Sequence, residues 1–350
     1  MNKKRLFIMI SLAAVMIFAG TSSYRMMADN EDDLLPGDYD VACHDKEHID
    51  GTADMEAGLL APDSEEAERT WAASAVEFTP VDIPASFRGT HDNKLVGGEN
   101  LNGVFDLIAH GDSVVRILQI GDSHVRGHSF PVAVRHTLEE SFGAQATGDD
   151  KISYHTDCIA SETGESGIVY SAIGINGARA SRFAEDDMIQ RIAAQHPNVV
   201  IVSFGTNESH AKGYDEDVHS GTIDTLLSRI SEACPDVRFL LTTPPGSYIS
   251  LRTGRTYRDR RGRRRYSYVK RQNTLTSRVA ANIVNYGKEH HIAVWDMYTI
   301  AGGEQFACTN WRGAGLMNND RIHYTVNGYR LQGHLLGEAF LKAYNEYVEH

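Results

Sequence analysis

Residues 114–124 read VVRILQIGDSH, a continuous apolar run with a single charge that leads directly into a glycine, an aspartate and a serine. A strand that is apolar on both faces is typical of a parallel sheet covered by helices on both sides. Similar short apolar runs recur at residues 168–173, 199–204, 237–241 and 292–295. Segments with helical spacing of apolar residues separate them, at 124–142, 178–195, 215–233, 268–290 and 326–347. With right-handed crossovers, this alternation predicts a three-layer α/β/α fold with a parallel five-stranded sheet.

The composition is that of a globular protein: 350 residues, of which 41% are hydrophobic and 23% are charged. Four cysteines are too few to be the main source of stability, and only one apolar run is long enough to suggest a membrane segment. The net charge of −13 is unevenly distributed: residues 1–28 carry +4, residues 29–77 carry −14 and residues 78–350 carry only −3. A nearly neutral body does not favour nucleic acid as a partner.

The N-terminus has the layout of a secretory signal, with a basic start, an apolar run over residues 6–19 and small polar residues after it. Residues 1–24 are therefore predicted to be a signal peptide or, if uncleaved, an N-terminal membrane anchor. Residues 25–77 are predicted to be an acidic flexible segment, because they carry the acidic excess and almost no apolar periodicity. The catalytic domain is expected over residues 78–350.

Reactive side chains follow the ends of three predicted elements. Ser123 comes directly after the first strand and would lie at the start of a helix, where backbone N–H groups favour negative charge. Asn207 follows the strand at 199–204, and Asp320 and His323 precede the last helix. The carboxyl ends of parallel strands meet at one edge of a sheet, so these groups are expected to converge. They supply a nucleophile, a base and a residue that orients the base.

These residues lie within motifs that resemble those of the SGNH (GDSL-type) hydrolase family, over roughly residues 114–347. Gly121-Asp122-Ser123 resembles the first block of that family, here with His124 in place of the usual leucine. The sequence GINGA at 174–178 resembles the second block, GTNE at 205–208 the third, and DRIH at 320–323 the fifth. The third block has glutamate where many members have aspartate. The resemblance implies the flavodoxin-like SGNH-hydrolase fold.

The resemblance also implies the role of each site residue. Ser123 is the expected nucleophile, His323 the base and Asp320 the residue that orients it. The backbone N–H groups of Ser123 and Gly177 and the side chain of Asn207 are the expected oxyanion hole. No cofactor is expected. A metal is not expected either: His124 and His128 are spaced four residues apart, but the helix lacks the glutamate of the zincin pattern.

Residues 117–124 most resemble an exported bacterial branch of the family that handles O-acetyl groups on peptidoglycan and other cell-envelope glycans. The likeness implies a periplasmic or envelope-associated serine esterase that removes short acyl groups, with an acylated glycan as its partner. An O-acetyltransferase with the same triad stays open, because the branch contains both activities. A catalytically silent glycan-binding protein is a further alternative.

Residues 252–271 are rich in arginine and are expected to overhang the site. They hold ten Lys or Arg against Asp259 alone, interleaved with three tyrosines. One hypothesis is a clamp for an anionic glycan, with Arg263, Arg264, Arg265 and Tyr266 binding substrate. The alternatives are a solvated hairpin or a nucleic-acid contact, and export argues against the latter.

Overall fold

The computed structural model describes residues 74–350 except 112–113, 145, 148–154 and 165–166. The predictions for residues 1–24, and for 25–77 up to residue 73, lie outside the described residues. The main sheet has the strand order β1-β10-β7-β6-β2-β5. Its strands are β1 (Leu95–Val96), β2 (Val114–Gly121), β5 (Gly167–Gly174), β6 (Val199–Ser203), β7 (Arg238–Thr242) and β10 (Ala293–Trp295). The last five are parallel to one another, which confirms the predicted α/β class and the five parallel strands.

The sheet has a sixth strand that the sequence did not predict. β1 pairs antiparallel with β10 at the edge, Leu95 opposite Trp295. Its two residues are too few to show an alternating pattern. A further two-stranded ribbon joins β3 (Ala146–Thr147) and β4 (Ser161–Glu162).

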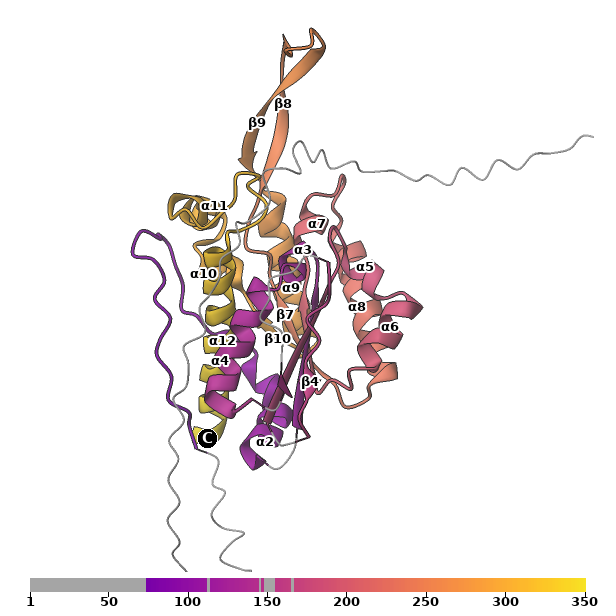
Figure 1. The fold of residues 1–350 in the computed structure, drawn as a ribbon, viewed down its shortest axis with the longest axis vertical. Helices are drawn as coiled ribbons and strands as arrows, with labels where there is room; N and C mark the ends of the chain where they lie inside the picture. Colours follow the sequence, from indigo (N-terminus) through magenta and orange to yellow (C-terminus); the bar gives the residue numbers. More distant parts are fainter. Residues whose placement is uncertain (1–73, 112–113, 145, 148–154, 165–166) are drawn as a thin grey trace, which may run out of the picture. The chain divides into compact units, whose positions relative to one another are not determined.

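Helices cover both faces of the sheet (Figure 1). One face is covered by α2 (Asn102–His110), α4 (Ser129–Phe142), α10 (Met297–Ile300), α11 (Gly303–Gly313) and α12 (Val326–Glu349). The other is covered by α5 (Ala180–Phe183), α6 (Asp186–Ala193), α8 (Glu216–Ala233) and α9 (Leu275–Glu289). Strand residues alternate between the two cores, as Ile117 and Leu118 do on β2, because successive side chains point to opposite faces. None of the helices described is long and apolar enough to cross a membrane.

Two expected helices are interrupted, in each case beside the site. The helix expected at 124–142 is divided into α3 (Ser123–Arg126) and α4, with His128 in the left-handed region at φ 63°. The helix expected at 178–195 is divided into α5 and α6. Each interruption ends a short helix at the carboxyl edge of the sheet, and apolar spacing alone does not reveal it.

The arginine-rich segment forms a long antiparallel hairpin of β8 (Tyr248–Arg258) and β9 (Arg264–Gln272), which projects from the domain (Figure 1). The helix expected from residue 268 was therefore wrong over residues 268–272, which belong to β9. Tyr266 and Tyr268 at alternate positions, followed by the β-branched Val269, favour a strand there, and the helix begins only at Leu275.

The first described residues lie along α12. The backbone of Val76 exchanges two hydrogen bonds with the side chain of Asn345, and the N–H of Val81 donates to Glu338. Lys342 donates to the carbonyl of Asn93 at the end of this stretch. These contacts begin slightly before the expected domain start at residue 78.

Candidate active site

The nucleophile candidate lies where β2 turns into α3. Gly121 is the last residue of β2, and a Cβ there would lie 2.4 Å from a methyl of Val125 and 2.6 Å from the carbonyl of Ser203. Asp122 caps the helix, its carboxylate accepting from the N–H of His124 at 2.9 Å. Ser123 therefore emerges at the first turn of α3, partly exposed.

The structure brings Ser123, His323 and Asp320 together as the sequence predicts. The Oγ of Ser123 lies 2.9 Å from Nε2 of His323, and Nδ1 of the same ring lies 2.6 Å from Oδ2 of Asp320. This is the arrangement in which an imidazole can remove the proton of a serine hydroxyl while a carboxylate holds its tautomer.

The loop that carries Asp320 and His323 is held by its own backbone. Oδ1 of Asp320 accepts from the N–H groups of Ile322 and His323, both at 3.0 Å, and Arg321, which directly follows Asp320, has φ 61°. Burial alone would raise the pKa of Asp320, but the hydrogen bond and charge of His323, with the two backbone N–H groups, outweigh it and hold that pKa well below its usual range. The carboxyl group therefore stays ionised beside the imidazole.

Asn207 connects the three parts of the expected oxyanion hole. It follows β6 in the short helix α7 (Thr206–Ser209), and its Nδ2 donates to the carbonyl of Ala178 at 2.9 Å. That contact places it beside Gly177, whose φ of 73° is in the region that favours glycine. Nδ2 also donates to Oδ2 of Asp122, the neighbour of Ser123, at 3.1 Å. Asn207 thus links the turn that carries Gly177 to the residue that precedes Ser123.

The sequence matches the GDSL-like lipase/acylhydrolase family over residues 120–331, a range that contains every residue of the triad and of the expected oxyanion hole. The chain belongs to this family. It is an ester hydrolase.

The fold is similar to that of several solved structures. A peptidoglycan O-acetylesterase is 16% identical and superposes with a TM-score of 0.56, covering 74% of this chain and 99% of its own. A carbohydrate esterase family 3 structure from Talaromyces cellulolyticus (15% identity, 66% of this chain and 99% of its own, TM-score 0.40) is more distant. A GDSL-like lipase from Bacteroides thetaiotaomicron is also more distant (14% identity, 71% and 100%, TM-score 0.36). No curated protein sequence matches the chain.

Glu208 of the acylhydrolase has a structural role that its sequence motif did not reveal. Its buried carboxylate accepts from the N–H of Gly205 at 2.9 Å and from that of Ala180 at 3.1 Å. It therefore ties the start of α7 to the start of α5, directly after the turn that carries Gly177. The only sequence signal was its place in the third block.

Asp122 also has a structural role beyond its place in the first motif. It is fully buried, and burial raises its pKa to about 7 although His124 and Asn207 hydrogen-bond to it. Because its Oδ2 accepts a proton of Asn207, that proton must turn away from Asp122 when the amide stabilises an oxyanion.

His124 is buried behind the triad of the acylhydrolase. Its Nδ1 lies 2.9 Å from the hydroxyl of Tyr329, and its ring centroid lies 5.4 Å from that of His323. Nε2 has no hydrogen-bond partner among the described residues. Burial, with the nearby charge of His323, lowers the pKa of His124 to about 3, so the ring is neutral at ordinary pH.

This burial predicts a pH-dependent effect of the His124→Leu substitution. An unfolded histidine binds a proton below pH 6.5, whereas the folded one does so only near pH 3. The stability that neutral His124 contributes is present above pH 6.5 and is lost as the pH falls through this window. Leucine does not titrate, so the variant should gain about 2 kcal/mol over the wild type between pH 7.5 and pH 5. Urea unfolding at both pH values measures this, and an unchanged difference would contradict it.

The hairpin of the acylhydrolase holds the catalytic loop at its base. The N–H of Tyr248 on β8 donates to the carbonyl of Arg321 at 2.8 Å, and Lys270 on β9 donates to the carbonyls of Asn319, at 3.0 Å, and Asp320. Sequence reasoning missed Lys270, whose only signal was the charge density of its segment.

The structure separates the four residues predicted to bind substrate. Arg263 and Arg265 lie with their Nε atoms 3.0 and 3.1 Å from the carboxylate of Asp259, at the hairpin turn. Arg264 and Tyr266 lie on the other face of β9. A substrate role for these residues stays a prediction.

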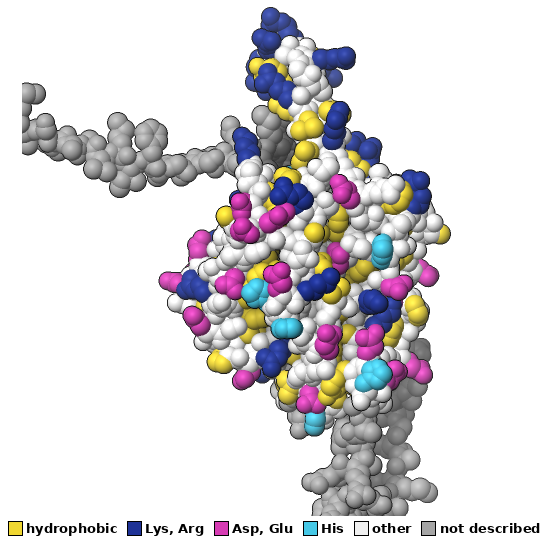
Figure 2. Space-filling view, turned by 180° about the vertical axis from the view of Figure 1, so that it is seen from behind, with side chains coloured by type: hydrophobic (Ala, Val, Ile, Leu, Met, Phe, Trp, Pro, Cys, Tyr) yellow, Lys and Arg dark blue, Asp and Glu magenta, His cyan; other side chains and the backbone are white. Residues whose placement is uncertain are grey.

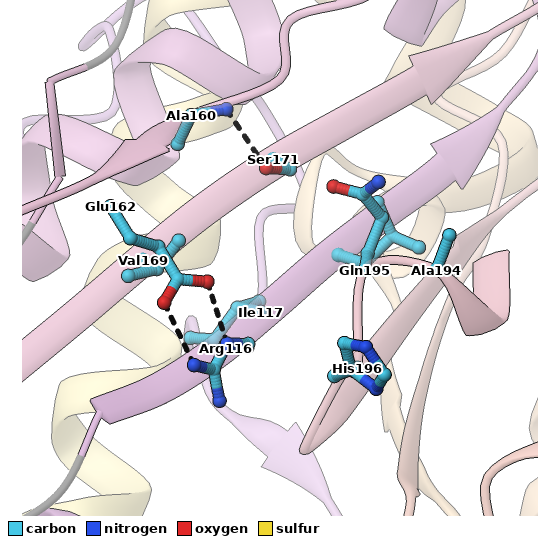
Figure 3. Close-up of a pocket in the computed structure, with 10 residues that line it drawn as sticks. Arg116, Ile117, Ala160, Glu162, Val169, Ser171, Ala194, Gln195 and His196 are labelled. Atoms are coloured by element: carbon cyan, nitrogen blue, oxygen red, sulfur yellow. Dashed lines mark hydrogen bonds and ion pairs between the residues drawn. The ribbon is translucent and has the colours of Figure 1, made fainter. Parts of the chain in front are cut away.

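Other candidate sites lie away from the triad. Figure 3 shows a cavity beside the first halves of β2 and β5, lined by Arg116, Glu162 and His196, in which Arg116 makes two hydrogen bonds of 2.7 Å to Glu162. Cys308 is a buried free thiol. In the part of the chain that the structure describes, no three His, Cys, Asp or Glu side chains form a metal-ligand set.

Proposed function

We propose that this acylhydrolase removes short acyl groups, acetyl above all, from glycans of the cell envelope, and that the chain is exported to the periplasm or envelope. The observation that carries the proposal is the contact of Ser123 with His323, at 2.9 Å, and of His323 with Asp320, at 2.6 Å. Membership of the family shows that the substrate contains an ester bond. The identity of the acyl group and of the glycan is our inference.

The proposed reaction follows from the positions of these groups. His323 accepts the proton of Ser123 as the serine oxygen attacks the ester carbonyl. The tetrahedral oxyanion is stabilised by the N–H groups of Ser123 and Gly177 and by the amide of Asn207. His323 then gives its proton to the departing glycan hydroxyl, which leaves an acyl-serine. Water, activated by the same imidazole, releases the acid.

Polar side chains beside the triad favour a short acyl group. His124 contacts the triad imidazole, and the charge of His323 contributes to lowering the pKa of His210, after the effect of burial. Asn207 donates a hydrogen bond to Asp122, the residue that precedes Ser123. A long acyl chain requires an apolar channel, which imidazoles and amides do not provide.

Two lines support a glycan substrate. Residues 117–124 resemble the branch of the family that handles O-acetyl groups on envelope glycans. The fold is also similar to that of a peptidoglycan O-acetylesterase, with a TM-score of 0.56 at 16% identity.

The apolar N-terminal run, with its basic start, supports export.

The proposal is tested with p-nitrophenyl esters of increasing chain length. We expect kcat/KM to fall more than tenfold from acetate to octanoate; a rise with chain length would contradict the short-acyl pocket.

Adding an acceptor oligosaccharide then separates two activities of the same triad. Free acetate as the main product supports the esterase, and transfer to the oligosaccharide would make the chain an O-acetyltransferase.

A further inference from the structure

The two faces of the β8–β9 hairpin differ in what they present. Residues on a strand alternate between faces, and the register pairs Arg252 with Tyr268 and Thr256 with Tyr266. One face therefore carries, from base to tip, Lys270, Tyr268, Arg252, Tyr266 and Arg264, which we call the track. The opposite face carries the exposed apolar pair Leu251 and Val269, together with Tyr257, Arg265 and Arg271.

Tyr266 lies near two guanidinium groups of the track. The guanidinium of Arg252 lies 3.1 Å from the centre of the Tyr266 ring, and that of Arg264 lies 6.0 Å from the same ring. Tyr268 is 58% exposed, so its ring is open to a ligand. Stacking of Arg252 on the Tyr266 ring leaves the N–H edges of its guanidinium available to an anion.

The positive charge of the track is not neutralised. Asp259, the one acid of residues 252–271, is occupied at the turn by Arg263 and Arg265. Among the described residues, neither Arg252 nor Arg264 has an acidic partner. Figure 2 shows Lys and Arg gathered on the projecting hairpin, whereas both charge signs are interspersed over the body of the domain on that side.

The track begins at the catalytic loop. Lys270, its first member, donates to the carbonyls of Asn319 and Asp320, one of which belongs to the triad. From Lys270 to Arg264 the strand advances six residues, or about 20 Å. A ligand lying on the track would therefore extend from the ester site outward over several sugar units.

We propose that the track binds an anionic, O-acylated polysaccharide, whose carboxylate or phosphate groups pair with Arg252, Arg264 and Lys270 while its sugar rings stack on Tyr268. This rests on the proposed function and gives it a substrate class. A linear row of cations and rings that starts at the triad fits a chain whose acylated unit lies at Ser123. Guanidinium groups bind carboxylate and phosphate alike, each in a bidentate manner, so both sources share this chemistry.

The test compares two double variants of the full chain with equal loss of charge. Arg252→Gln/Arg264→Gln alters the track. Arg271→Gln/Arg261→Gln removes one arginine from the opposite face and one from the turn. Each is assayed on O-acetylated polygalacturonate, on the neutral polymer O-acetylated xylan and on p-nitrophenyl acetate.

We expect the track variant to lose at least tenfold in kcat/KM on acetylated polygalacturonate relative to p-nitrophenyl acetate, mainly through KM, and the control variant to lose less than twofold. Rising salt should weaken the wild type's preference for the charged polymer. Two results would contradict the proposal. One is an equal loss of kcat/KM in the two double variants, and the other is a wild type that does not prefer the charged polymer over xylan.

A binding measurement separates failure of the track from failure of the esterase function. Binding of unacetylated polygalacturonate to the Ser123→Ala protein requires no catalysis, and it should weaken at least tenfold when Arg252 and Arg264 are also replaced. Bound polygalacturonate that is displaced by further polygalacturonate or by inorganic polyphosphate supports anion binding by the track. The stronger competitor identifies the preferred anion. Tighter binding of a single-stranded oligonucleotide or of anionic lipid vesicles than of either polymer would overturn the assignment to a glycan.

Discussion

Replacing Ser123 with alanine should reduce turnover of p-nitrophenyl acetate by a factor on the order of 10⁴ to 10⁶. The hydroxyl oxygen lies 2.9 Å from Nε2 of His323, and no acyl-enzyme can form without it. The change leaves a methyl group in a partly exposed position, so the fold should persist, as thermal unfolding can verify. Ser228→Ala, on the exposed surface of α8, is the matched control and should keep full activity.

The triad also predicts how two substitutions combine. His323→Ala should cost about as much as Ser123→Ala, and the double variant should lose little more, because the two groups act as one unit. Losses that multiply would mean that the residues act separately. A folded Ser123→Ala protein with more than 1% of the wild-type rate would place the nucleophile elsewhere. If neither this variant nor the wild type exceeds the uncatalysed rate, the catalytically silent glycan-binding protein is favoured.

Replacing Asn207 with alanine is the second large effect, an expected fall in kcat of about 10²- to 10³-fold, or about 2.7–4 kcal/mol. The oxyanion exists only in the transition state, so KM should change little. The nucleophile is intact in this variant, and a fluorophosphonate probe should still label it slowly, whereas Ser123→Ala should not be labelled at all.

The hydrogen bonds that Asn207 makes in the structure compete with the donation to the oxyanion that this prediction requires. Its two amide protons are donated to Ala178 and Asp122, at 2.9 and 3.1 Å. If kcat of Asn207→Ala stays within threefold of the wild type, the amide keeps those partners during catalysis. The backbone N–H groups of Ser123 and Gly177 would then form the oxyanion hole alone.

Much of the fold was predictable because its signals are local. Strands that are apolar on both faces, such as β2 and β6, are consistent only with a covered parallel sheet, and the carboxyl ends of such strands lie together. That reasoning predicts from the sequence that Ser123, Asn207 and His323 lie at one edge of the sheet. The edge strand β1 was missed because two residues carry no periodicity.

Several contacts of the site depend on residues far apart in the chain. Tyr329 lies beside His124, Asn207 beside Asp122, and Lys270 beside the carbonyl of Asp320. No spacing rule connects such positions, because they meet only when the helices and the hairpin pack at the edge of the sheet. The same is true of His124, where the sequence showed a departure from leucine but not its burial.

The sequence by itself determined the sheet, the family and the identity of the reactive side chains, since strand periodicity and short motifs are properties of neighbouring residues. The tertiary structure decided which of those side chains touch, which charges are neutralised and which arginines share a face. Arg263 and Arg265 are adjacent to Arg264 in the chain, yet they pair with Asp259 while Arg264 lies beside Tyr266. Alternation along β9 puts Arg264 and Arg265 on opposite faces of the hairpin. The pairing of β8 with β9 decides which residues of β8 each of them meets.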